Sequence, residues 1–388
     1  MVVISETSDD GSNGGDHQNK KLKEEENRIK NLKEKVKVSL PIPEELILRC
    51  FLLVRRCHHP SLSLVCNSFL RLMPKLYDDR LRLGYTESVL YAYIVLLPSD
   101  ENPSWYILHR KPYRNLPNTI SLRLCKLDIL PRPPMLWGCA MVTIGSDIYL
   151  IGGKVGKERS SDMILIDCKS HKYRSLPRMK VARCLAAAGV DRFRAAAGVI
   201  DGKIYVIGGC KTWSSVPGPY PKAYGSGEFL TYAVMKEKIY CLDLCRNVHS
   251  YDPKESKWDS WVSNALSSFW NESSCVIDNL LFCKNTIVRF HGWRPVIIYD
   301  PELKIWFFLE GLQGFPENIF LDECKMANFG GKLVILGADV SRIRGNDGRK
   351  REIWCIEIAW ERKENGRFWG KVESVAVVLT PTKTSSVD

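Results

Sequence analysis

The sequence predicts a mainly β fold of stacked hairpins, preceded by a small α-helical module. A hairpin unit, its repetition and a switch from helical to strand-like spacing lead to this prediction. In residues 193–209, FRAAAGVIDGKIYVIGG, two short apolar strands flank Asp201-Gly202, a pair that suits the positive φ angles of a two-residue hairpin turn. A near copy, MVTIGSDIYLIGG, spans 141–153. Weaker copies lie at 234–242, 275–283 and 327–337. One hairpin cannot bury its own apolar face, so we expect several to stack.

Length and composition point away from several classes of protein. The chain has 388 residues, a hydrophobic fraction of 45% and 11 tryptophans, which favours two or three packed units. Its longest apolar run, 89–97, is far shorter than the roughly 20 residues of a membrane span. The first 38 residues are polar and charged, unlike a signal peptide. We therefore expect no membrane association and a location in the cytoplasm, the nucleus or both.

Neither the cysteines nor the charge predicts a cofactor or a nucleic-acid site. The 14 cysteines are spread singly, which favours small buried side chains in a reducing compartment, and Cys241 and Cys245 lack zinc-knuckle spacing. The net charge of +12 is dispersed, with eight basic residues beside four glutamates in 20–37. No groove-reading helix or RNA-binding motif accompanies them. We expect no metal, no cofactor and no specific nucleic-acid partner.

The N-terminal segment, 1–38, is predicted to be a tail. Residues 1–19 are rich in Ser, Asp, Gly and Asn, a composition typical of disorder. Residues 20–37 carry apolar positions at spacings of 7, 3 and 4, which fit either a short amphipathic helix or a charged linker. Both interpretations stay open.

The helical module is predicted over 39–84. Pro43-Glu44-Glu45 is a good helix start, because proline costs no hydrogen bond in the first turn and the acids suit the positive end of the helix dipole. After His58-His59-Pro60, Ser61 is expected to cap a second helix. The two apolar stripes comprise Leu46, Ile47, Cys50, Phe51 and Val54, then Leu62, Val65, Cys66, Phe69, Leu72 and Met73. Leu48, Leu52, Leu53 and Leu64 fall outside them, so we expect a partner to cover the surplus apolar surface.

From Glu87 onward the pattern is β, with strands expected at 89–95 and 105–109. Two strand endings match in detail, YDPKESKW at 251–258 and YDPELKIW at 299–306, with an offset of 48 residues. A period near 50 with paired glycines and a later aromatic is the kelch pattern of a β-propeller blade. The glycine pairs are Gly152-Gly153 and Gly208-Gly209, which would lie near the central channel. Last-strand aromatics, expected to pack between blades, are Trp105, Tyr173, Trp213, Trp258, Trp306 and Trp369. They predict six blades within 85–383, with five as the alternative and a tail at 384–388.

The third repeat departs from this pattern. Tyr173 follows Gly153 by twenty residues, whereas Trp213 follows Gly209 by only four, so about one strand is missing. A short phrase, AAAGV, occurs at both 186–190 and 195–199. The duplication could supply a replacement strand, the blade could be defective, or the gene model could be altered.

The helical segment resembles an F-box, the module that docks on a Skp-family adaptor of cullin-based ubiquitin ligases. The match rests on IPEELIL at 42–48, PSLSLV at 60–65 and FLRL at 69–72, with Ile42-Pro43 where the family usually has Leu-Pro. By this resemblance the adaptor would be met by Ile42, Pro43, Ile47, Leu64, Val65 and Phe69. The alternative is an ordinary helical hairpin that belongs to the next domain.

Together, an N-terminal F-box and C-terminal kelch repeats resemble the plant F-box/kelch family over about 39–383. Residues 352–358 and 368–373 are similar to that family's last blade. The resemblance implies a substrate-recognition subunit of a Skp–cullin–F-box ubiquitin ligase. Its F-box would reach the cullin/RING core through the adaptor, and its propeller would bind an unknown target protein.

Catalysis has little support in the sequence. The seven histidines, at 17, 58, 59, 109, 171, 249 and 291, accompany no nucleophile elbow, phosphate loop or metal-ligand pair. We expect a receptor without catalytic residues of its own. The first alternative is a kelch scaffold whose F-box does not dock, and the second is a propeller enzyme that would carry stoichiometric metal.

Overall fold

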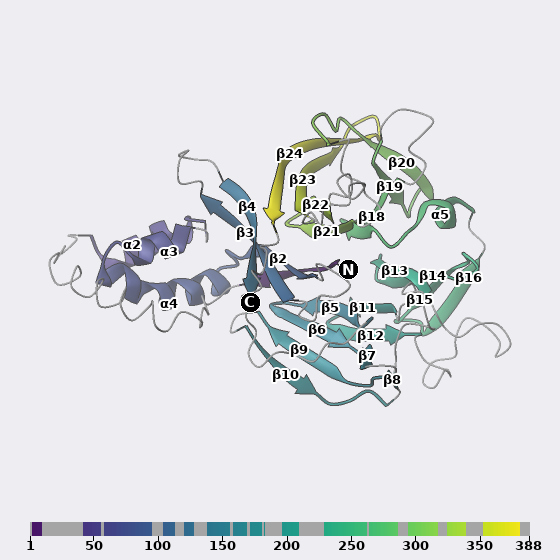
Figure 1. The fold of residues 1–388 in the computed structure, drawn as a ribbon, viewed down its shortest axis with the longest axis horizontal. Coiled ribbons are helices and arrows are strands. Elements are labelled where there is room, and N and C mark those ends of the chain that lie inside the picture. Colours follow the sequence, from purple (N-terminus) through teal and green to yellow (C-terminus); the bar gives the residue numbers. More distant parts are fainter. Residues whose placement is uncertain are drawn as a thin grey trace, which may run out of the picture.

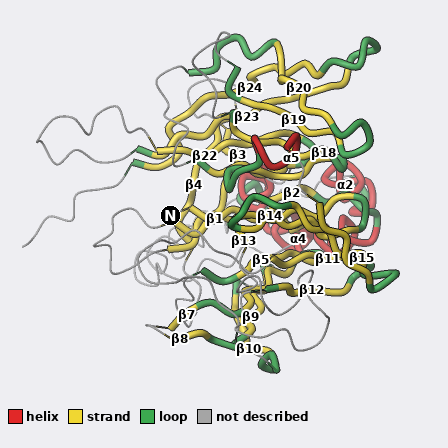
Figure 2. The backbone as a smooth tube through the Cα atoms, turned by 90° about the vertical axis from the view of Figure 1, so that its right-hand side faces the viewer, coloured by secondary structure: helices red, strands yellow, loops and turns green. Residues whose placement is uncertain are grey.

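The computed structural model describes most of the chain. The described residues are 2–9, 42–55, 58–94, 104–112, 120–127, 138–155, 158–168, 171–180, 182, 196–208, 229–261, 264–285, 294–316, 324–338 and 352–380. Strands make up nearly all of the body, and Figure 2 shows them in yellow beside a few red helices.

The body is a kelch-type β-propeller of six blades (Figure 1). Each blade contributes one inner strand, and each inner strand lies next to those of the neighbouring blades, so the six form a closed ring. In ring order they are β1 (Val2–Asp9), β5 (Ala140–Ile144), β11 (Ala196–Ile200), β13 (Phe229–Met235), β17 (Ser274–Ile277) and β21 (Lys325–Phe329).

The remaining strands extend each blade outward in antiparallel order, apart from a small extra hairpin. The first blade adds β2 (Glu87–Ile94), β3 (Ser104–Pro112) and β4 (Ile120–Leu127). The second adds β6 (Asp147–Ile151), β9 (Met163–Asp167) and β10 (Lys172–Leu176), with the extra hairpin of β7 (Lys154–Val155) and β8 (Glu158–Arg159). The third adds only β12 (Lys203–Ile207) among the described residues.

The last three blades are complete. The fourth adds β14 (Lys238–Asp243), β15 (Val248–Asp252) and β16 (Lys257–Trp261), and the short helix α5 (Asn264–Phe269) follows it. The fifth adds β18 (Leu280–Lys284), β19 (Val296–Asp300) and β20 (Ile305–Glu310). The sixth adds β22 (Lys332–Ala338), β23 (Ile353–Arg362) and β24 (Phe368–Leu379).

The hairpin predicted from the repeat is confirmed. β11 and β12 pair in register around the turn, with Ile200 opposite Lys203. Asp201 and Gly202 take φ angles of 49° and 69°, the positive pair that a tight two-residue turn requires. Gly152 and Gly153 also have positive φ, so they turn the chain at the end of β6.

The first residues correct a sequence-based expectation. Residues 2–9 were expected to be disordered, yet they form β1 and pair antiparallel with β2 from Val2 opposite Ile94 to Asp9 opposite Glu87. The inner edge of β2 would otherwise present unpaired amides and carbonyls, and β1 satisfies them. Because β1 takes the inner position, Trp105 lies in β3, the third strand, and not in the last strand as expected.

Each pair of neighbouring blades shares a hydrophobic core. Between blades 6 and 1, for example, Leu90 and Leu108 pack with Leu336 and Cys355. Corresponding clusters lie at the other five blade boundaries. The burial of apolar side chains between blades therefore stabilises the whole ring.

One boundary is also joined by backbone pairing. The outer strands β20 and β24 run parallel, with Leu309 opposite Phe368 and Glu310 opposite Trp369. Blades 5 and 6 consequently form one continuous sheet of eight strands.

The predicted helical hairpin consists of three helices, α2 (Glu44–Leu52), α3 (His59–Ser63) and α4 (Asn67–Arg82), called here the helical module. It projects from the side of the first blade (Figure 1). Ser61 does not cap a helix but lies within α3, because α3 already starts at His59-Pro60 and a separate α4 begins after Cys66. In the part of the chain that the structure describes, no helix has the length and apolarity to cross a membrane.

Candidate functional site

The helical module has a small core of its own. Ile47, Leu48 and Phe51 of α2 pack against Leu72, Met73 and Leu76 of α4. The expectation that Leu48 lies outside the buried stripe is wrong, whereas Leu46 of the predicted stripe is exposed. The buried stripe is shifted by about one residue along α2 relative to the predicted stripe, so that α2 buries the pair Ile47-Leu48.

Three of the six residues expected to meet an adaptor are exposed apolar side chains. The exposed fractions are 50% for Ile42, 66% for Leu64 and 63% for Val65. Pro43 is also exposed. Leu46, Leu53 and Leu70 are further exposed apolar residues of the module. So much apolar surface on three short helices is typical of a docking face.

The other two expected residues belong to the interior of the module. Ile47 is only 8% exposed. Phe69 is half-buried and meets the ring of Phe51 edge-on, with 4.7 Å between ring centroids. Both side chains therefore contribute to the core of the module and not to its exposed surface.

Backbone hydrogen bonds define the segments that carry the exposed residues. Pro43 precedes α2 in an extended conformation, and its carbonyl accepts hydrogen bonds from the amides of Leu46 at 3.0 Å and Ile47 at 3.2 Å. The helix start predicted at Pro43 is thus confirmed, and Ile42 lies before it. At the end of α3, the amides of Leu64 and Val65 bond to the carbonyls of Ser61 and Leu62 and close a turn.

The module also contains a buried cation that the sequence analysis did not single out. Arg80 lies on the buried stripe of α4, four residues after Leu76, and is 8% exposed. The sequence did contain a signal for it, because a charged residue stands at a position where the helical spacing predicts a core side chain. Arginine is rarely buried without a partner, so such a position indicates a specific contact.

Four of the six aromatic residues expected between blades, Trp105, Tyr173, Trp258 and Trp306, pack in cores at blade boundaries, whereas Trp369 is 40% exposed. Tyr173 packs against the core between blades 1 and 2, Trp258 against that between blades 3 and 4, and Trp306 against that between blades 4 and 5. Trp306 also donates its indole N–H to the carbonyl of Ala265, at 2.6 Å. Gly208 has a positive φ, like Gly152 and Gly153, whereas Gly209 and Trp213 lie outside the described residues.

A Ser–His–Asp hydrogen-bond chain crosses the fourth blade. His249 is fully buried, with Nδ1 2.8 Å from Oγ of Ser260 and Nε2 3.2 Å from Oδ2 of Asp243. Burial lowers the pKa of His249, although the hydrogen bond to Asp243 acts in the opposite direction. Asp243 also accepts hydrogen bonds from the amide and side chain of Asn247. These hydrogen bonds therefore connect the tight turn between β14 and β15 to β16, so the Ser–His–Asp arrangement stabilises the blade.

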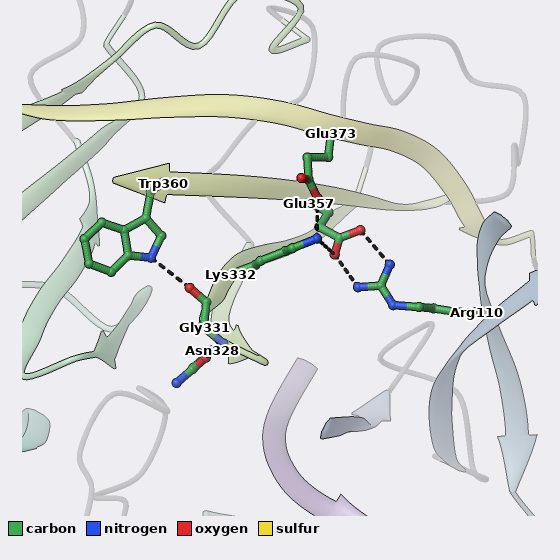
Figure 3. A network of polar contacts seen from close by, with 7 residues as sticks. All are labelled: Arg110, Asn328, Gly331, Lys332, Glu357, Trp360 and Glu373. Carbon is green, nitrogen blue, oxygen red and sulfur yellow. Dashed lines mark hydrogen bonds and ion pairs between the residues drawn. The ribbon is translucent and has the colours of Figure 1, made fainter. Parts of the chain in front are cut away.

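A second polar network joins the first and last blades (Figure 3). The carboxylate of Glu357, on β23, is nearly buried and accepts two hydrogen bonds from Arg110 of β3. Lys332 lies 3.5 Å from the same carboxylate and also pairs with Glu373. Burial raises the pKa of Glu357, but the hydrogen bonds and positive charges of Arg110 and Lys332 outweigh it and hold the pKa below its usual value.

Metal ligands do not gather in the described part of the chain. No group of three or more His, Cys, Asp or Glu side chains there could hold a metal ion. The exposed apolar face of the helical module is accordingly the candidate functional site.

Comparison with known proteins supports both modules. The family model described as the FKB95 kelch-repeats domain matches residues 105–379. A putative F-box/kelch-repeat protein of Arabidopsis thaliana is 67% identical, with 100% of this chain and 98% of the relative covered. An Arabidopsis kelch repeat-containing protein is 40% identical over 98% of the chain and 96% of its own length. An Arabidopsis F-box/LRR-repeat/kelch-repeat protein is also 40% identical, over 100% of this chain and 98% of its own length.

The alignment lengths carry further information. The alignment with the 67% identical relative spans 435 positions, which is 47 more than the 388 residues of this chain. Nearly all of both proteins is covered, so most of these extra positions are internal to the relative. The relative therefore has about 47 residues in total that have no counterpart in this chain.

Proposed function

Because the chain belongs to the plant F-box/kelch-repeat family, we propose that it is the substrate-recognition subunit of a Skp–cullin–F-box ubiquitin ligase. Its F-box would dock on a Skp-family adaptor, and its propeller would bind the protein to be ubiquitinated. The observation that carries this proposal is the exposed apolar face of the helical module, which includes Ile42, Leu64 and Val65.

The mechanism would be proximity. Holding a target beside a charged ubiquitin carrier raises its effective concentration there, so the receptor needs no chemistry of its own. Transfer would then proceed through the cullin/RING core, which the adaptor recruits. We also propose that the protein works in the cytoplasm, the nucleus or both.

A charge at the docking face tests the proposal. In Ile42→Asp or Leu64→Asp, docking would bury an unpaired carboxylate, which costs several kcal/mol and weakens binding by about a hundredfold or more. We expect co-purification with a Skp-family adaptor of the same species to be lost, while the melting transition of the propeller is unchanged. Leu303→Asp is the matched control, because Leu303 is an equally exposed leucine on the propeller. Failure of the wild type to bind any such adaptor would overturn the proposal.

The second candidate is a kelch scaffold with an F-box that does not dock. It is favoured by the name of one relative, a kelch repeat-containing protein without F-box in its description, although it aligns over 98% of this chain. A wild-type chain that binds target proteins but no adaptor would support this alternative.

A further inference from the structure

We propose that Arg80 and Glu87 form the joint that sets the orientation of the helical module relative to the propeller. This inference rests on the proposed function, since it makes both residues positioning residues for ubiquitin transfer. Neither residue belongs to the adaptor-docking face, and their contacts lie on the opposite, propeller-facing end of α4.

The first half of the joint lies inside the module. Nη1 of Arg80 donates to the carbonyl of Leu52 at 2.7 Å and to that of Val54 at 3.1 Å. These carbonyls lie at the C-terminal end of α2, where a positive charge favourably meets the negative end of the helix dipole. Arg80 therefore fastens α4 to the end of α2.

The second half reaches the propeller. Nη2 of Arg80 donates to Oε1 of Glu87 at 2.9 Å, and Glu87 is the first residue of β2. One guanidinium thus connects α2, α4 and the first blade. A planar group with several donors in fixed directions can make these bonds at once, whereas the single ammonium of lysine is a point charge on a flexible stem.

The covalent connection at this point is short and hydrogen-bonded. Four residues, 83–86, separate α4 from β2. Gly84 takes a φ of 72°, and the amide of Tyr85 bonds to the carbonyl of Arg80 at 2.9 Å. The chain fixes one point of the joint and the Arg80–Glu87 ion pair fixes a second, so rotation of the module about the connection is restrained.

Such restraint matters for a proximity mechanism. The effective concentration of a tethered target depends on the length and stiffness of everything between the two binding sites. A stiff joint confines the target to a narrow range of positions relative to the ubiquitin carrier. A loose joint would spread those positions without altering either binding surface.

Distance distributions measured by pulsed electron resonance on the full-length chain test the joint. Spin labels are carried by non-natural amino acids at Glu45 of α2 and Lys304 of the fifth blade, both exposed, because free cysteines occur elsewhere. Glu87→Ala removes the propeller end of the joint and leaves the bonds of Arg80 to α2 in place. We expect its distance distribution to broaden relative to the wild type, with an unchanged melting transition.

The controls separate orientation from folding and from adaptor binding. Glu237→Ala deletes the partner of Lys254 in an exposed ion pair of the fourth blade and should leave the distribution narrow. Arg80→Lys, which keeps the charge, should broaden it as Glu87→Ala does. A distance distribution in Glu87→Ala that is as narrow as that of the wild type would overturn the inference. So would a wild-type distribution that is already as broad as that of the variant. The measurement needs no adaptor, so a loss of the proposed function would be detected separately, by co-purification.

Discussion

Arg110 of β3 and Glu357 of β23 are 247 positions apart in the chain, yet they form a two-point ion pair across the boundary between the first and last blades. Nη1 of Arg110 donates to Oε2 at 3.1 Å, and Nη2 donates to Oε1. Arg110 also lies over the ring of Phe329, 4.9 Å from its centroid. The pair thus fastens the ring where its two ends meet.

Glu357→Gln should destabilise the propeller. It leaves Arg110 without its charged partner, and breaking a buried pair costs about 3–5 kcal/mol, reduced here to about 2–4 because Arg110 is partly exposed. Urea unfolding measures the loss. Glu361→Gln is the control, because its pair with Lys363 is exposed. Equal stability of the two variants would contradict this assignment.

The same pair predicts an acid-dependent stability. The pKa of Glu357 is lowered in the folded state, so its stabilising contribution is present above the unfolded value of 4.5 and is lost as the pH falls through the folded value. The difference in unfolding free energy between wild type and Glu357→Gln should therefore shrink below about pH 4.5. A difference that stays constant from pH 7 to pH 3 would show that the charge of Glu357 is not involved.

Gly311→Ala should weaken the junction of blades 5 and 6. Gly311 has a φ of 78°, and an added Cβ would lie 2.2 Å from Cε2 of Trp369. Backbone strain of about 1–2 kcal/mol and displacement of the indole would combine. Gly366→Ala is a matched control, because its φ is 79° and nothing lies within 4 Å of the added Cβ. The excess loss in Gly311→Ala, measured in denaturant, isolates the contact with Trp369, and equal losses would deny it.

Trp258→Ala and Trp306→Ala should each cost about 2–4 kcal/mol, since both remove a large side chain packed between blades. Trp261→Ala on the outer strand β16 should cost less, because Trp261 is exposed. Chemical denaturation compares the three. If all three variants lose the same amount, the two boundary tryptophans have no special role.

One of the three interpretations of the third repeat is that Cys184–Val190, which lies outside the described residues, supplies the strand missing from this blade. Its amides should then resist hydrogen exchange about as well as those of Ile204–Ile207 in β12. Rapid exchange there, with early proteolysis in 213–228, would indicate a broken blade instead.

Local features of the fold could be predicted from the sequence, whereas long-range pairings could not. Asp201-Gly202 identifies its turn because the dipeptide alone favours positive φ, and Pro43 identifies a helix start for a similar local reason. The pairing of Val2 with Ile94 leaves no such mark, because the apolar run Val2-Val3-Ile4 is short and leads into a Ser-, Asp- and Gly-rich stretch, which resembles a tail until the partner edge is known. Leu48 was misassigned because one residue of rotation on a short helix exchanges buried and exposed positions.

The place of β1 in the ring has a consequence for biosynthesis. β1 leaves the ribosome first, but one of its neighbours in the ring, β21, belongs to the last blade to be made. The circle can therefore close only when synthesis is almost complete, and a nascent chain must keep its earliest strand available until then. A deletion of residues 2–9 would keep every helix of the helical module but would leave a gap in the circle that no later segment of the described chain fills.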